Sequence, residues 1–396
     1  MYKKYYSRFL ENNAGIQHFA CHSHYYWPDV TRSAMIEYWD DSAKYVDAKW
    51  SYFFTEKIPL AQKYIAKVLN TSKPQQIVFA PNTHEFIVRL LSCFHPQKPL
   101  KILSTDSEFH SFSRQISRLN EFDHISLTTV NTLPSDTFEE RFIEEIRKNK
   151  YDMIFFSHVF FSSGIAIQDL AGIVNAVDNP ECMIVVDGYH AFMSIETDIR
   201  SIENRIFYFA GSYKYAQGGE GCCFMHVPEK NQYRPWNTGW FADFESLENN
   251  KNTVIQYAAD GMKFSGATMD FSALYRLISV FRWLENENIR LSDIRTYIQK
   301  MQQLFLDEID KYDHPLINRK RLLINDLGNH GHFFSFKFDT VEQVEKMHKL
   351  LNEYKIITDY RLERLRFGFA LYHDGNYDLS VLNTRRAYFF DEFIFN

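Results

Sequence analysis

The chain has 396 residues, 45% hydrophobic and 24% charged, which suits a soluble globular protein of two or three domains and excludes a disordered, collagen-like or coiled-coil chain. Lys and Arg number 44 against 50 Asp and Glu, a formal net charge of −6, so we expect no nucleic-acid partner. No apolar run is long enough to cross a membrane, and the N-terminus lacks the apolar core of a secretion signal. These features predict a cytoplasmic protein without a membrane partner.

Cysteine usage agrees with that location. The five cysteines are odd in number and irregular in spacing, and they form no zinc-binding pattern. They are Cys21, Cys93, Cys182, Cys222 and Cys223. We expect them to be reduced, mostly buried thiols and predict no metal site.

The first two thirds of the chain alternate between short apolar runs and helix-like segments. Most of the runs are apolar throughout, as in a sheet that is buried on both faces. The predicted strands are 77–80, 102–104, 153–156, 183–186, 206–209 and 222–225, and the predicted helices are 84–94, 137–149 and 169–175. Strands that alternate with helices in this way predict an α/β domain with a mainly parallel sheet.

The pattern changes after about residue 270. Long amphipathic helices are predicted over 272–285 and 291–312, followed by an alternating, half-buried strand over 333–338 and a helix over 341–354. A final strand pair is predicted from 356–358 and 365–368. We therefore divide the chain into an N-terminal arm (1–15), a large α/β domain (16–270) and a small C-terminal α+β domain (271–396).

Two polar segments each follow directly on an apolar run. The first is Asp187-Gly188-Tyr189-His190, and the second, 27 residues on, is Ser212-Tyr213-Lys214-Tyr215. Ligands bind at the carboxyl ends of parallel strands, and a lysine among small and aromatic residues is a candidate for Schiff-base chemistry. Taken singly, Asp187 could simply cap a helix and Lys214 could lie on the surface. An Asp and a Lys after successive strands are together what a pyridoxal 5′-phosphate (PLP) enzyme requires.

In these motifs and their spacing the sequence resembles the class V aminotransferase branch of the fold-type I PLP enzymes, and within it the kynureninases. The resemblance covers residues 15 to 375 and implies a fold-type I PLP-dependent transferase. It implies that Lys214 binds the cofactor's aldehyde as a Schiff base and moves the proton at the substrate's Cα. It also implies that Asp187 holds the pyridine nitrogen protonated, that His190 lies near the cofactor's O3′ or the Asp, and that Tyr213 reaches the phosphate.

The phosphate is expected at Ala80-Pro81-Asn82-Thr83-His84, where a strand ends and a helix begins with Asn82 as a plausible cap. A plain capped helix would give the same sequence. The resemblance makes this turn the phosphate loop, with Asn82, Thr83 and His84 as its ligands. It also implies that Trp240 of Gly239-Trp240-Phe241 and Thr268 of the 264–268 loop complete the phosphate site of the neighbouring subunit in a homodimer with shared active sites.

Two further residue types are expected at the site. A ring should stack on the cofactor after the strand at 102–104, and we favour Phe109, with His110 second. A guanidinium suits the carboxylate of an amino-acid substrate, and by position Arg366 matches the family's carboxylate-binding arginine. Arg361 and Arg364 are expected to form structural ion pairs instead.

The N-terminal segment 18–28 is rich in histidine and aromatic residues. Its spacing fits no pair of metal ligands on one helix face. The resemblance places this segment at the substrate entrance, so His24 and Tyr25 are predicted to contact the substrate.

The sequence gives weaker evidence about which reaction the protein catalyses. Kynureninases carry a catalytic tyrosine where this chain has Ser162, which argues against strict hydrolysis of L-kynurenine. Cysteine desulfurases need a nucleophilic cysteine in the C-terminal third, and the last one here is Cys223. The hypotheses are a PLP-dependent aminotransferase or β-bond lyase acting on an amino acid, a kynureninase-like hydrolase cleaving Cβ–Cγ of an aromatic amino acid, and an inactive relative used for binding.

Overall fold

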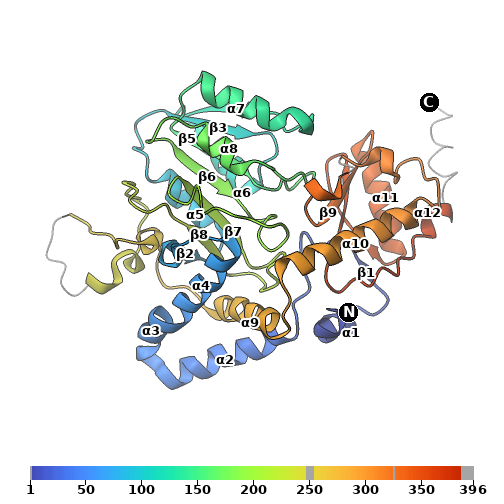
Figure 1. Cartoon of the computed structure of the whole chain (residues 1–396), viewed down its shortest axis with the longest axis horizontal. Coiled ribbons are helices and arrows are strands. Elements are labelled where there is room, and N and C mark those ends of the chain that lie inside the picture. The colour runs from blue at the N-terminus through green and yellow to red at the C-terminus, as the bar shows by residue number, and fades with distance from the viewer. Residues whose placement is uncertain (1, 247–253, 324–325, 385–396) are drawn as a thin grey trace. The chain divides into compact units, whose positions relative to one another are not determined.

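The computed structural model describes residues 2–246, 254–323 and 326–384. By its internal contacts the chain divides into two compact units, shown in the ribbon of Figure 1. The larger unit comprises Val30–Phe161 and Ala166–Asn288. The smaller unit comprises Met1–Asp29, Ser162–Ile165 and Ile289–Asn396.

A seven-stranded sheet forms the centre of the larger unit, in the order β2-β8-β7-β6-β5-β3-β4. Its strands are β2 (Ile77–Ala80), β3 (Leu100–Thr105), β4 (Ile125–Val130), β5 (Met153–Ser157), β6 (Met183–Asp187), β7 (Ile206–Gly211) and β8 (Cys223–His226). The strands from β4 to β7 pair in parallel, and β8 runs antiparallel to both of its neighbours. The predicted α/β fold with a mainly parallel sheet is confirmed.

The burial of each strand explains whether it could be predicted from the sequence. Every residue of β2, β5, β6, β7 and β8 is buried, as the continuous apolar runs predict. The edge strand β4 was not predicted, because no residue of its sequence Ile-Ser-Leu-Thr-Thr-Val is buried.

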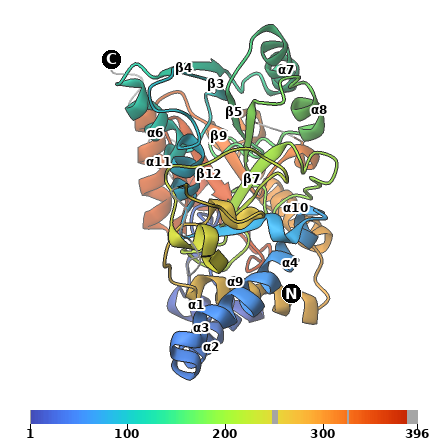
Figure 2. The ribbon, with the colours of Figure 1, turned by 90° about the vertical axis from the view of Figure 1, so that its left-hand side faces the viewer.

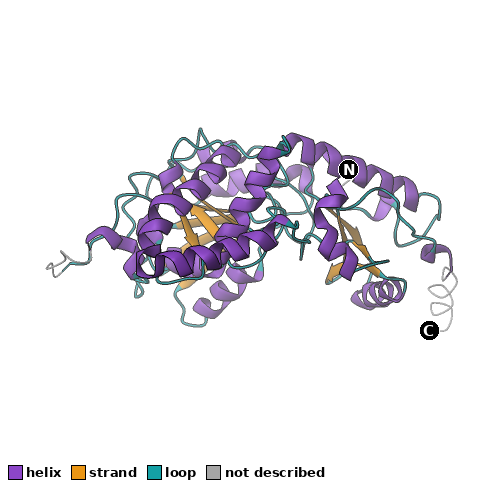
Figure 3. Ribbon diagram, turned by 90° about the horizontal axis from the view of Figure 1, so that it is seen from below, coloured by secondary structure: helices purple, strands orange, loops and turns teal. Residues whose placement is uncertain are grey.

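Helices surround this sheet, as Figure 3 shows by colour. The helices of the larger unit are α2 (Val30–Tyr45), α3 (Lys49–Tyr52), α4 (Ile58–Leu69), α5 (Thr83–Leu91), α6 (His110–Asn120), α7 (Phe138–Lys148), α8 (Leu170–Asn175) and α9 (Ser272–Asn286). Two of them begin at side chains that accept a backbone N–H, Asn82 before α5 and Asp169 before α8. In Figure 2, α2 lies against α9.

The smaller unit combines helices with two small sheets. Its helices are α1 (Ser7–Asn12), α10 (Leu291–Ile309), α11 (Val341–Glu353) and α12 (Val381–Thr384). Its strands are β1 (Gln17–His18), β9 (Phe333–Lys337), β10 (Ile356–Ile357), β11 (Asp359–Arg361) and β12 (Arg364–Gly368). β11, β12 and β9 form an antiparallel sheet in that order, and β1 pairs in parallel with β10.

Two details of the predicted smaller domain are wrong. The run 356–358 does not pair with 365–368: the chain reverses at Leu362, at φ 50°, so 359–361 becomes the partner of β12 and Ile356–Ile357 pairs with Gln17–His18. β9 is not half-buried, since only Lys337 is exposed. Phe305 of α10 contacts Phe334 and Phe336 on one face, and His22 stacks on Phe333 on the other.

The division of the chain also differs from the predicted domains. Residues up to Asp29 belong to the smaller unit, so they are more than a 15-residue arm. Helix α9 belongs to the larger unit, where it packs against α2 and α4. The predicted small domain also included 324–325 and 385–396, which lie outside the described residues.

Candidate active site

The ends of four neighbouring strands meet at one edge of the large sheet. β5 ends at Ser157 and β6 at Asp187, and these two residues are paired in the register. β7 ends at Gly211, three residues before Lys214. β8 is antiparallel, so its first residue, Cys223, lies opposite Gly211 at the same edge. The topology therefore gathers polar side chains from distant parts of the sequence.

A pocket of about 210 Å³ opens at this edge, within the larger unit. Its walls come from the strand ends, the start of α5 and the turn before α6. The lining residues are Pro81, Asn82, Thr83, Phe109, Ser111, Ser157, Phe161, Asp187, Tyr189, His190, Tyr213, Lys214, Glu220, Gly221 and Cys223. Most of the predicted cofactor residues therefore share one pocket.

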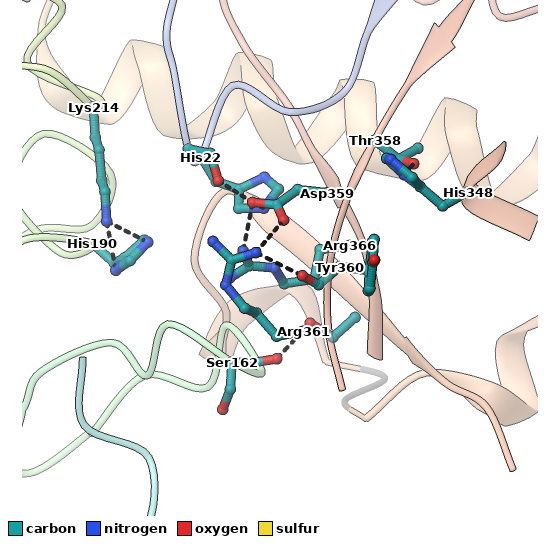
Figure 4. A network of polar contacts seen from close by, with 12 residues as sticks. His22, Ser162, His190, Lys214, His348, Thr358, Asp359, Tyr360, Arg361 and Arg366 are labelled. Carbon is teal, nitrogen blue, oxygen red and sulfur yellow. Dashed lines mark hydrogen bonds and ion pairs between the residues drawn. The ribbon is translucent and has the colours of Figure 1, made fainter. Parts of the chain in front are cut away.

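Lys214 is buried, with 5% of its surface exposed, and points at the ring of His190 (Figure 4). Its Nζ lies 2.8 Å from Nε2 and 3.3 Å from Nδ1 of that imidazole. The rings of Tyr189 and Phe109 lie 4.9 and 5.5 Å from Nζ. The amine thus lies against the imidazole of His190 in a largely apolar pocket.

Asp187 is a buried carboxylate in the same pocket. Burial raises the pKa of Asp187, while the Tyr189 N–H that it accepts at 2.8 Å and the charge of Lys214 lower it. Gly188 is required next to it, because a Cβ there would lie 2.1 Å from the Tyr208 hydroxyl. A protonated ring nitrogen would give this carboxylate the cationic partner that a buried charge needs.

The start of α5 forms the wall where a phosphate is expected. Asn82 caps the helix by accepting the Glu85 N–H at 3.0 Å, and Thr83 is buried and lines the pocket. His84 is exposed and is not part of the lining, because the next helical position turns its side chain outward. The first N–H groups of a helix and their positive dipole end favour a phosphate at this wall.

Phe109 supplies an aromatic wall. It directly precedes α6 and packs edge-on against Phe161, with ring centroids 5.4 Å apart. His110, the second choice for the stacking ring, is exposed and outside the lining. Tyr213 also lines the pocket, and its predicted contact with the phosphate stays a prediction.

Trp240 and Thr268 do not line this pocket, and both are exposed. Their two loops lie together, because the Phe241 N–H donates to the Gly266 carbonyl at 3.0 Å. Gly239 permits this contact, since a Cβ there would lie 2.2 Å from the Gly266 oxygen. The predicted role of both residues across a dimer stays a prediction.

In the smaller unit, Arg366 is buried on β12 and donates to Asp359 Oδ2 at 2.6 Å (Figure 4). Ser23 also donates to this carboxylate, and His22 Nε2 lies 3.7 Å from it. Burial by itself would raise the pKa of Asp359, but Arg366, His22 and Ser23 outweigh that effect and lower it to about 2. Arg366 is therefore held by a carboxylate whose pKa is lowered.

The other two arginines of this segment are Arg361, which shares Asp359 with Arg366, and Arg364. Arg361 makes the predicted ion pair, with Asp359 at 2.8 Å. Arg364 donates to the hydroxyl of Ser162 at 2.6 Å.

His24 and Tyr25 do not line the pocket of the larger unit. His24 is exposed. Tyr25 is buried in the core of the smaller unit, where its hydroxyl accepts the Leu371 N–H at 2.7 Å and its ring packs against Tyr372. The predicted substrate contacts are not seen at this pocket.

Sequence reasoning missed Ser157, Cys223 and Glu108. Ser157 is the polar last residue of an apolar run, which is a usable signal in sequence. The position of Cys223 in the pocket could not be predicted, because the apolar run does not show that β8 is antiparallel. Glu108 lies behind the lining, with its carboxylate bonded to Thr105 and Ser157.

Over the described residues, no group of three or more His, Cys, Asp or Glu side chains is arranged to hold a metal ion. In the same residues no helix is long and apolar enough to span a bilayer. All five cysteines are free thiols, as predicted, and only Cys93 is not fully buried.

A lysine and an aspartate at neighbouring strand ends, facing a helix N-terminus, define an α/β enzyme whose pocket fits an aromatic, phosphorylated aldehyde cofactor. The chain belongs to the aminotransferase class-V family, whose model matches residues 28–359. The expected cofactor, pyridoxal 5′-phosphate, is thereby confirmed at the level of the family.

A curated relative and several solved structures are similar to the chain. A cysteine desulfurase from Wigglesworthia glossinidia brevipalpis is 22% identical over 178 residues, which are 44% of this chain and 43% of that protein. The cystine C–S lyase C-DES is 15% identical, with 96% and 98% of the chains covered and a TM-score of 0.78. The cysteine desulfurase CsdA from Escherichia coli is 15% identical, with 98% of each chain covered and a TM-score of 0.75. At these identities the structures establish the fold.

Proposed function

We propose that this protein is a pyridoxal phosphate-dependent lyase that breaks a bond at the β carbon of an amino acid. The contact of Lys214 Nζ with His190 Nε2 at 2.8 Å, in a buried pocket that also holds Asp187, carries the proposal. A buried lysine beside an imidazole can take up and return a proton, which is the step that every such reaction needs at Cα.

Each wall of the pocket has a role in this proposal. When bound, the cofactor supplies an electron sink for negative charge at the substrate's Cα. Lys214 anchors the aldehyde and moves the Cα proton, and His190 exchanges a proton with Lys214 Nζ. Asp187 would hold a proton on the ring nitrogen, the first turn of α5 would bind the phosphate, and Phe109 would supply an aromatic wall that excludes water.

The named relatives act on cysteine or cystine. For such a substrate, the thiols of this chain favour a β-elimination over the transfer of sulfur to a cysteine. A desulfurase takes up sulfur on a cysteine thiolate, and Cys223 is the cysteine in the pocket. Burial raises the pKa of the Cys223 thiol to about 12, and it raises the pKa of the other four thiols as well. Burial thus disfavours the thiolate form at all five, so we propose elimination to a 2-oxo acid and ammonium.

A second candidate is the cleavage of Cβ–Cγ in an aromatic amino acid. It is favoured by the aromatic lining of the pocket, which includes Phe109, Phe161, Tyr189 and Tyr213. Ser162 in place of the kynureninase tyrosine counts against it. Transamination remains a third outcome, distinguished by its need for a 2-oxo acid acceptor.

One assay separates the three. The purified protein is first mixed with pyridoxal phosphate. Its visible absorption spectrum is then recorded before and after borohydride, which should bleach the band of a cofactor bound to lysine. The protein is then given L-cystine, L-cysteine or L-kynurenine, with and without a 2-oxo acid. We expect pyruvate and ammonium from a sulfur amino acid without acceptor; L-cysteine and water would give pyruvate, ammonia and hydrogen sulfide. Anthranilate from kynurenine would favour the second candidate, and dependence on the acceptor would favour transamination. No band would overturn the proposal.

We also propose that the active form is a homodimer in which Trp240 and Thr268 approach the partner's phosphate site, and that Arg366 binds the substrate carboxylate. Light scattering tests the first part, and a monomer would contradict it. For Arg366, R366K is expected to raise the apparent KM for the amino acid while the cofactor spectrum stays unchanged.

A further inference from the structure

Glu108 is a buried carboxyl group that lies behind the pocket. It is 6% exposed and occupies the turn between β3 and Phe109. Its Oε1 accepts the Thr105 hydroxyl at 2.6 Å and the Ser157 N–H at 3.1 Å, and its Oε2 accepts the Ser157 hydroxyl at 2.6 Å. One side chain thus joins the ends of β3 and β5.

Glu108 is connected to two parts of the pocket wall, Ser157 and Phe109. Ser157 lines the pocket and is paired with Asp187 in the β5–β6 register. On the other side, Glu108 directly precedes Phe109, whose ring faces Lys214 Nζ from 5.5 Å. The strands β3 and β5 are paired in parallel at Ile102 and Leu103, which precede Thr105 by three and two residues. The carboxyl therefore adds a side-chain link between the segment before Phe109 and Ser157, beyond the backbone pairing of the two strands.

We propose that Glu108 is a positioning residue of the cofactor pocket, which joins β3 to β5 and thereby holds Phe109 and Ser157 in place around the bound cofactor. The inference rests on the proposed function, because it assigns Glu108 to the same pocket. Glu108 is not among the lining residues, so it acts through Thr105, Ser157 and Phe109 and not by touching the cofactor.

The chain offers a matched control. Glu203 is 5% exposed and accepts the same three kinds of donor: the Thr71 hydroxyl at 2.6 Å, the Ser72 N–H at 2.8 Å and the Ser72 hydroxyl at 2.5 Å. It joins the segment after α4 to the segment between β6 and β7, and none of these residues lines the pocket. E108A and E203A therefore remove the same set of hydrogen bonds from different places.

The test compares wild type, E108A, E108Q and E203A as full-length protein. Thermal unfolding of the apoproteins reports folding, titration with pyridoxal phosphate gives the Kd, and visible circular dichroism reports the asymmetry around the bound cofactor. E108A is expected to weaken binding about tenfold or more and to change the dichroic band. E108Q, whose amide can still bond Thr105 and Ser157, is expected to bind within about threefold of wild type.

E203A is expected to lose thermal stability while it keeps the wild-type Kd and dichroic band. Glu108 would be a purely structural residue, and the proposal overturned, if E108A bound the cofactor and gave the band as wild type does. The proposal would also be overturned if E203A changed the cofactor Kd and the dichroic band as much as E108A does. If E108A fails to fold, the comparison of E108Q and E108D, which shortens the side chain, decides by the same readouts. A wild type that binds no cofactor would refute the proposed function itself.

Discussion

Glu108 and Glu203 lie in two regions of the larger unit and make nearly the same hydrogen bonds, yet their carboxyl groups differ in acidity. Burial raises the pKa of Glu108 to about 8, and the hydrogen bonds from Ser157 and Thr105 do not offset it. Burial acts in the same direction on Glu203, but the bonds from Ser72 and Thr71 outweigh it, and its pKa is lowered.

The balance between burial and hydrogen bonding separates the two sites, and a neighbouring charge adds a smaller effect at each. Glu108 faces Asp187, whose negative charge raises its pKa further. Glu203 faces His226, whose positive charge lowers its pKa. The comparison teaches that similar hydrogen bonds can accompany a raised carboxyl pKa beside the cofactor pocket and a lowered one elsewhere, according to whether burial or the hydrogen bonds have the larger effect.

The largest expected effect is on Lys214 of the pocket, compared with Lys57, a buried lysine elsewhere in the larger unit. Lys214 and Lys57 are equally buried, at 5% exposure, but Lys57 is paired with Glu37 at 2.6 Å. K214A is expected to abolish the borohydride-sensitive band and to lower turnover by at least about 100-fold, since it removes the proton carrier. K57A is expected to lose stability and keep the band. Absorption spectra and product assays check both, and a K214A protein with a wild-type band would place the aldehyde on another residue.

A smaller effect is expected from E203A on stability. Three donors would lose their acceptor, which should cost about 3 kcal/mol of unfolding free energy at pH 7. Because the pKa of Glu203 is lowered in the folded state, its contribution is present above its unfolded pKa of about 4.5 and is lost as the pH falls through the folded value. Urea unfolding should therefore show the E203A defect shrinking in acid, and a defect independent of pH would contradict the assignment.

E108Q is expected to change the slope of stability with pH. The folded protein keeps the Glu108 proton up to about pH 8, whereas the unfolded chain releases it near pH 4.5, so wild-type stability falls as the pH rises between these values. One such proton gives a slope of up to about 1.4 kcal/mol per pH unit. E108Q should remove that part of the slope in apoprotein unfolding curves between pH 5 and 8, and equal slopes in the two proteins would be evidence against a neutral Glu108.

The smallest effect is expected at the start of α5, from H84A compared with T83A. His84 is exposed, so H84A should leave stability within about 0.5 kcal/mol of wild type and leave the cofactor Kd unchanged. Thr83 lines the pocket, so T83A should weaken cofactor binding. Titrations with pyridoxal phosphate check both, and weaker cofactor binding by H84A would support the phosphate contact that the sequence predicts for His84.

Much of the site could be predicted from sequence because its signals are local. Asp187 follows directly on β6 and Lys214 shortly after β7, and the apolar runs before them needed no partner to be recognised. His84 could not be separated from Thr83, because that distinction depends on which direction each position of α5 faces. The pairing of Ile356–Ile357 with Gln17–His18 could not be foreseen either, because it joins residues far apart in the chain.

The sequence by itself determined the alternation of strands and helices, the family, and the lysine and aspartate at the strand ends, because burial and short motifs leave their mark on consecutive residues. Only the tertiary structure decided that His190 lies against Lys214, that Cys223 joins the same pocket through an antiparallel strand, and that Glu108 joins β3 to β5. These contacts depend on strand order and register, which are set by the packing of the whole sheet and not by any single segment.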